Sequence, residues 1–155
     1  MNKTNPDQLP RLYSMNTIGM TTFLGSLFAG GCLLAANYYA LGMRQLGNLT
    51  LGISFVLFGL FIIIVSPQIP NSNTEQLSGQ VVQLALFVST TQVIAMVIAT
   101  HFLQGGMLTS FREMNGQYFS TLRGVGIGFA AYLGAVIALS LLINLFGLEG
   151  LIKAR

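Results

Sequence analysis

The chain has 155 residues, of which 53% are hydrophobic and only 7% are charged, and its formal net charge is +3 at pH 7. A soluble domain carries about 25% charged residues, so this composition excludes an ordinary water-exposed surface and predicts one covered largely by lipid. The positive charge comes from few residues and forms no basic run, which argues against a nucleic-acid partner and favours contact with membrane lipids.

Four long stretches without Asp, Glu, Lys or Arg predict four membrane-spanning helices. A helix needs about 20 apolar residues to cross the hydrocarbon layer, and a charge near its centre costs at least ~2.5–3.5 kcal/mol. We therefore expect an all-α, polytopic transmembrane bundle of four helices. The expected spans are 16–41, 49–65, 79–103 and 124–146, in one domain at 16–147 between polar tails at 1–15 and 148–155.

Turn and interface signals separate these spans. Tyr38 lies near the end of the first span, and tyrosine is enriched where membrane meets water. A turn containing Arg44 is expected at 42–48. Pro67 begins a run of turn residues after the second span, and the Gly105–Gly106 pair is expected to break the third.

The segment 107–123, before the last span, allows two interpretations. Its apolar residues recur every three or four positions, which is typical of a short amphipathic helix lying in the interface. The alternative is an ordinary connector whose periodicity arises by chance. The recurring apolar residues are Met107, Phe111, Met114, Tyr118 and Leu122.

The orientation in the membrane is undecided by charge. With four spans, both termini and the middle loop share one side of the membrane, and the two remaining loops share the other. Four Lys or Arg residues against three do not satisfy the positive-inside rule for either side, although the loops alone favour the second set in the cytoplasm. The first set is Lys3, Arg11, Lys153 and Arg155, and the second is Arg44, Arg112 and Arg123.

Small residues recur every fourth position in the last span, which is typical of close helix packing. Helices in lipid associate where small residues let two backbones approach, and the first span has similar positions. These faces pack either the protein's own bundle or a second copy or another membrane subunit. The candidate packing residues are Gly25, Gly30, Gly124, Gly126, Gly128, Ala130, Gly134 and Ala138.

The third span is the most polar of the four. At about 100° per residue, Gln83 and His101 share a face, whereas Gln92 lies opposite. Such side chains either form hydrogen bonds between helices or line a path for a small solute or ion. The candidate set is Asn37, Gln83, Thr90, Gln92 and His101.

Sequence motifs of catalysis and metal binding are missing. The chain has no HExxH, no GxSxG, no paired carboxylates and no P-loop. His101 is the only histidine and Cys32 the only cysteine, whereas a metal site generally needs three or four ligands. We therefore expect no enzymatic activity, no cofactor and no metal site.

The N-terminal part of the chain resembles the opening of a group of small, uncharacterised bacterial integral membrane proteins. It carries the pattern LYS-x3-I-x3-TFLGS-x2-AGG-x-LLA-x-NY-x-ALG, which begins at Leu12 and ends at Gly42. Tyr39 departs from the group, in which a basic residue is frequent at this position. The resemblance implies a multi-pass protein of the bacterial inner membrane, and it carries no activity and no catalytic or ligand-binding residues.

From these patterns we expect a non-catalytic integral membrane protein. Its expected role is that of an accessory or assembly subunit that packs against other membrane helices or against a second copy of itself. The alternative is a channel or transporter for a small solute or ion, lined by the polar third span.

Overall fold

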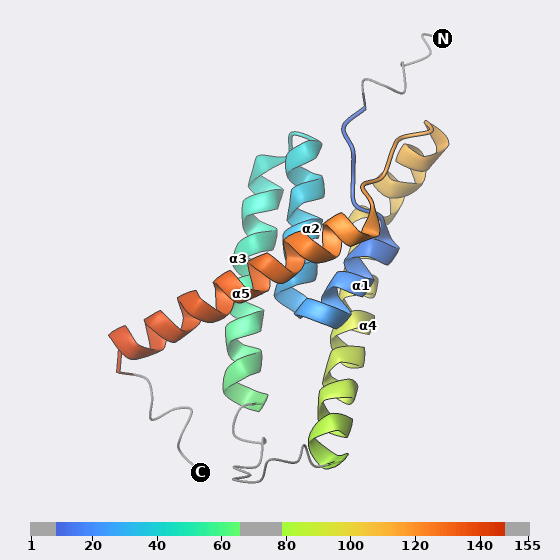
Figure 1. The fold of residues 1–155 in the computed structure, drawn as a ribbon. Helices are drawn as coiled ribbons and strands as arrows, with labels where there is room; N and C mark the ends of the chain where they lie inside the picture. Colours follow the sequence, from blue (N-terminus) through green and yellow to red (C-terminus); the bar gives the residue numbers. More distant parts are fainter. Residues whose placement is uncertain (1–8, 66–78, 148–155) are drawn as a thin grey trace.

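The computed structural model describes residues 9–65 and 79–147, and these form five helices (Figure 1). Three of the five are long and apolar enough to cross a membrane, namely α3, α4 and α5. The expectation of an all-helical membrane protein is confirmed, but the expectation of four spanning helices is wrong. The helices are α1 (Met15–Gly25), α2 (Leu27–Ala40), α3 (Arg44–Val65), α4 (Gly79–Glu113) and α5 (Thr121–Leu145).

In place of the single first span expected at 16–41, α1 and α2 form a hairpin. The Tyr13 N–H donates to Asn37 Oδ1 at 2.7 Å, whereas a straight helix would place these residues about 36 Å apart. The arms have 11 and 14 residues. At about 1.5 Å per residue, neither arm crosses the ~30 Å of hydrocarbon, so the hairpin enters the bundle and returns to the same end.

The chain reverses at Ser26, whose φ of 124° and ψ of 173° end α1 and begin α2. Small residues then let α2 pack tightly on its neighbours. A Cβ on Gly30 would collide with the Thr22 side chain of α1, and a Cβ on Gly31 would collide with Ser54 of α3. The apolar run of the expected span therefore folds back on itself, with Phe23 and Leu24 exposed just before the reversal and Ala29 to Gly31 buried just after it.

The remaining helices surround this hairpin. α2 and α3 are antiparallel and joined by a short turn in which Gly42 has a φ of 77°. The hairpin lies between α3 and α4, and α5 crosses α2 and α3 obliquely (Figure 1). The crossing is packed by aromatic side chains, since the Phe58 and Tyr132 rings lie 5.9 Å apart.

The Gly105–Gly106 pair does not break α4, which continues to Glu113. The separate interfacial helix considered for 107–123 is therefore also wrong. A glycine inside a helix costs about 1 kcal/mol relative to alanine, which a buried helix face can offset. The 35 residues of α4 measure roughly 52 Å, so part of this helix extends beyond the ~30 Å of hydrocarbon.

The connection between α4 and α5 is tied to the N-terminal segment. Both backbone groups of Leu12 form hydrogen bonds with this connection. The Leu12 N–H donates to Gln117 O at 3.4 Å, and the Leu12 C=O accepts from Phe119 N at 2.9 Å. Leu12 and Tyr13 are 1% and 5% exposed. Residues 9–15 of the expected tail are thus part of the fold, while its residues 1–8 and the expected tail at 148–155 lie outside the described residues.

All charged side chains of the described segments lie at one end of the bundle. Because the hairpin returns to its starting side, Arg11 and Arg44 share an end that four full spans would have separated. The pairing of Leu12 with residues 117–119 brings the α4–α5 connection to this end as well. We call it the arginine end; it carries Arg11, Arg44, Arg112, Glu113 and Arg123. The other basic residues used in the orientation argument lie outside the described residues.

Candidate functional site

Asn37 lies at the centre of a buried hydrogen-bond network that closes the hairpin. Its Nδ2 donates to Tyr13 O at 2.9 Å and to Gln104 Oε1 at 3.1 Å. The Gln104 Nε2 in turn donates to Leu34 O at 2.9 Å. Asn37 and Gln104 are each 1% exposed, and their amide groups are satisfied within the core. This arrangement is that of a structural network and leaves little for a ligand to contact.

Gln104 was missed by the sequence interpretation, which followed a nine-residue spacing along α4. The inward face of α4 instead has a residue every fourth position, as expected for a helix packed along one side. Comparing residues at intervals of four along this helix would have placed Gln92 and Gln104 on the same face. The buried residues of this face are Gln92, Met96, Thr100, Gln104 and Leu108.

Gln92 contacts the tip of the hairpin. Its Oε1 accepts from the N–H of Leu27, the first residue of α2, at 3.0 Å. The first N–H groups of a helix have no partner within the helix, so this side chain satisfies one of them from outside. Two hydroxyl oxygens that precede Leu27 in the sequence are buried and have no hydrogen-bond partner among the described residues, namely Thr21 Oγ1 and Ser26 Oγ.

The other candidate polar-path residues do not join Gln92. Gln83, Thr90 and His101 are exposed on outer faces of α4, because the four-residue face fixes which side of the helix turns inward. Asn37 lies in the closed network described above. The five residues therefore do not converge on one path within the described part of the chain.

The small residues of α5 form two faces with different surroundings. Gly124 and Gly128 are buried, and a Cβ on them would collide with Thr17 and Thr21 of α1, respectively. Gly126 and Gly134 are exposed, and apart from the adjoining residues of α5 itself no described atom lies within 4 Å of a Cβ placed on either. One face thus packs the protein's own bundle and the other is open.

The rest of the candidate packing set divides in the same way. Ala130 is exposed and Ala138 is half-buried, on the same side of α5 as Gly126 and Gly134. Gly25 is buried, and a Cβ there would lie 2.8 Å from the Cβ of Ala29. Together with Gly30, which packs on Thr22, it belongs to the hairpin. We call the set Gly126, Ala130, Gly134 and Ala138 the open face of α5.

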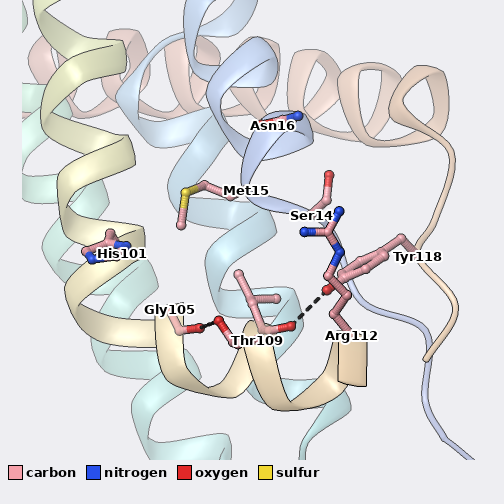
Figure 2. A pocket seen from close by; sticks show the side chains of 9 residues that line it. Ser14, Met15, Asn16, His101, Gly105, Thr109, Arg112 and Tyr118 are labelled. Carbon is pink, nitrogen blue, oxygen red and sulfur yellow. Dashed lines mark hydrogen bonds between the residues drawn. The ribbon is translucent and has the colours of Figure 1, made fainter. Parts of the chain in front are cut away.

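A cavity of about 410 Å³ lies at the arginine end, between the start of α1 and the last turns of α4 (Figure 2). Three of its hydroxyl groups are already held within the protein: Ser14 Oγ accepts from Thr17 N, Thr109 Oγ1 donates to Gly105 O, and Tyr118 OH donates to Leu108 O. Its polar lining side chains are Ser14, Asn16, His101, Thr109, Arg112 and Tyr118.

The electrostatics of this cavity are dominated by Arg112. Burial raises the pKa of the Tyr118 phenol, and the positive charge of Arg112 acts in the opposite direction. A tyrosine phenol with its ordinary pKa of about 10 is already neutral at pH 7, and the upward shift leaves Tyr118 so. The cavity lining contains no acidic side chain.

A metal centre finds no support among residues 9–65 and 79–147, which hold no group of three or more His, Cys, Asp or Glu side chains that could bind an ion. Comparison with known proteins finds no matching family model, no matching curated protein and no matching solved structure. The function is therefore argued from the geometry.

Proposed function

We propose that this protein is a non-catalytic membrane subunit that associates laterally, through the open face of α5, with a second copy or with another membrane protein. The observation that carries the proposal is the pair of small-residue faces on one helix. Positions 124 and 126 differ by about 200° around the helix. The face at 124 and 128 is packed against α1, while on the open face no other described helix lies within 4 Å of a Cβ placed on Gly126 or Gly134.

The packed face illustrates how this helix uses small residues. With no side chain at Gly128, the α5 backbone comes close to α1 and α2, and a Cβ there would lie 3.5 Å from Ala29 O. In lipid such close approach stabilises a helix pair through van der Waals contact and weak Cα–H···O bonds. The open face offers a partner helix the same chemistry.

Large apolar side chains border the open face. Leu133 and Ile137 are exposed beside Gly134, and Ile127 is exposed beside Gly126. Side chains of this size form ridges, and the row of small residues between them forms a groove. Helices pack by fitting the ridges of one into the grooves of another. Lipid can cover this surface, but a complementary helix fills the groove more completely.

The proposal is tested by native mass measurement of the full chain extracted in mild detergent. We expect a species larger than one chain, and we expect Gly134→Leu to reduce it to the mass of the monomer. Gly52→Leu is the matched control, because Gly52 is an exposed glycine of α3 with no described atom within 4 Å of a Cβ. A monomeric wild-type chain, or a complex unaffected by Gly134→Leu, contradicts the proposal.

Cross-linking distinguishes a second copy from another protein. In a Cys32→Ala background, Ala130→Cys should give a covalent dimer with a short bismaleimide if the partner is a second copy. Gly52→Cys should give none. A cross-linked product of a different mass would identify a different subunit as the partner.

The alternative, a small-solute or ion conduit, is supported by one feature. α2 begins inside the bundle with the N–H of Leu27 held by Gln92, and interrupted helices of this kind form solute sites in some transporters. The scattered positions of the other polar residues weaken it. Gln92→Leu should change flux through liposomes containing the protein if this alternative is right. A protein that passes neither ions nor small uncharged solutes contradicts it.

We further propose that the protein resides in a bacterial cytoplasmic membrane with its arginine end in the cytoplasm. The resemblance of residues 12–42 supports the compartment. The gathering of Arg11, Arg44, Arg112 and Arg123 at one end supports the orientation, because cytoplasmic segments near spanning helices are rich in Lys and Arg.

A further inference from the structure

We infer that the cavity between the start of α1 and the end of α4 binds the phosphate group of an anionic membrane lipid. The inference is independent of the proposed assembly, because it concerns Arg112 and the cavity at the arginine end and makes no use of α5's open face.

Arg112 is the first element of the site. Its guanidinium has no ion-pair or hydrogen-bond partner within the described segments, although Glu113 is its neighbour in sequence. In Figure 2 its side chain extends along the cavity toward Ser14. An unpaired guanidinium presents several donors in a fixed fork, which suits the oxygens of a phosphate group.

Backbone donors complete the site on the opposite wall. Ser14 caps α1 by accepting from Thr17 N, which leaves the N–H groups of Met15 and Asn16 without a partner among the described residues. Both residues line the same cavity as Arg112. The positive end of the α1 dipole therefore adds to the charge of the arginine. The Asn16 side-chain amide can donate as well.

The size and position of the cavity favour a lipid over a free ion. Its volume of about 410 Å³ is many times the ~30 Å³ that one water occupies in the liquid. It lies at the arginine end, where anionic headgroups are attracted. The Phe102 ring lies 5.9 Å from the ring of His101, which lines the cavity. Phe102 is 83% exposed and Ile98, one turn earlier in α4, is also exposed, so α4 offers an apolar surface for acyl chains next to a residue of the cavity wall.

The experiment measures lipid binding by the full chain in neutral detergent, using native mass spectrometry during titration with phosphatidylglycerol. We expect Arg112→Gln to weaken binding at least about tenfold, because a hydrogen bond to a charged group is worth enough to account for that factor. Arg123→Gln is the matched control. Arg123 lies at the same end but is placed over the Phe119 ring, 4.4 Å from its centroid, and does not line the cavity.

A second pair of variants tests the cavity without removing an arginine. Asn16→Asp places a negative charge in the cavity and should also weaken binding of phosphatidylglycerol. Asn115→Asp adds the same charge at an exposed position of the same end, outside the cavity lining, and should have little effect. Circular dichroism of all four variants verifies that the helices are retained.

Three results would overturn the inference. Equal losses in Arg112→Gln and Arg123→Gln would indicate diffuse attraction to a basic surface. Equal binding of phosphatidylcholine and phosphatidylglycerol would show that an anionic headgroup is not selected. Displacement of bound phosphatidylglycerol by millimolar inorganic phosphate would assign the cavity to a soluble phosphate in place of a lipid.

Discussion

Asn37 pairs with both backbone groups of Tyr13, accepting from its N–H at 2.7 Å and donating to its C=O at 2.9 Å. The two residues are 24 positions apart. Tyr13 precedes α1 and its extended backbone has no helical partners for these groups, so the Asn37 amide replaces the bonds that a helix or strand would supply. This pair holds the outer ends of the α1–α2 hairpin together.

Replacing Asn37 with leucine should destabilise the protein by at least ~2 kcal/mol. The change leaves the Tyr13 N–H and C=O and the Gln104 amide oxygen buried without their partner, and each such group costs about 1–3 kcal/mol. Denaturation in detergent, followed by circular dichroism, measures the loss. Asn144→Leu is the control, since Asn144 is exposed and donates only to Ser140 O within α5. Similar losses in the two variants would refute the role assigned to Asn37.

Replacing Ser26 with glycine should stabilise the protein by about 1–2 kcal/mol. The φ of 124° at this position is one that only glycine adopts readily, and the Ser26 hydroxyl is buried without a partner in the described chain. Ser140→Gly, inside α5, should instead destabilise by about 0.5 kcal/mol. Midpoints of thermal unfolding compare the two. A loss of stability in Ser26→Gly would show that the hydroxyl has a partner of its own.

The two faces of α5 should respond oppositely to the same change. Gly128→Leu should prevent folding, because its side chain would occupy the space of Thr21 and Ala29, and overpacking of this kind costs several kcal/mol. Gly126→Leu should leave folding intact, since no other described helix lies within 4 Å of a Cβ placed there. Yield of monodisperse protein and helical content after purification separate the two outcomes; equal behaviour would argue against the packing of α5 on α1.

The hairpin predicts which ends of the helices share a side of the membrane. In a Cys32→Ala background, cysteine at Met43 should react only with a thiol reagent that enters the cytoplasm. Cysteine at Gly79, at the opposite end of α4 from Glu113, should react with an impermeant reagent added outside. Both positions are exposed. The reverse pattern would place the arginine end outside, and labelling of both from the same side would contradict the arrangement of α3 and α4.

Much of the helix content was predictable from the sequence because it follows from local composition. The spans predicted at 49–65, 79–103 and 124–146 lie within or nearly within α3, α4 and α5. A long uncharged stretch must satisfy its backbone groups internally in lipid, and a helix does so over its whole length. The predicted ends of the helices were less accurate, since α4 continues through two glycines to Glu113.

The arrangement of the candidate sites was less predictable. The two faces of α5 have the same small-residue spacing, and only the position of α1 decides that Gly128 is buried and Gly126 is open. The cavity at the arginine end joins residues of α1 to residues of α4 more than 80 positions later, so no local pattern could reveal it.

The sequence by itself determined the medium of this protein and the helical state of its apolar segments, because both depend on residues close together in the chain. Only the tertiary structure decided that 16–41 turns back at Ser26. A straight helix and a hairpin remove the same apolar side chains from water, and no proline marks the reversal. The choice rests on the hydrogen bonds that Asn37 donates to Tyr13 O and Gln104 Oε1 and accepts from Tyr13 N, which exist only once distant parts of the chain have met.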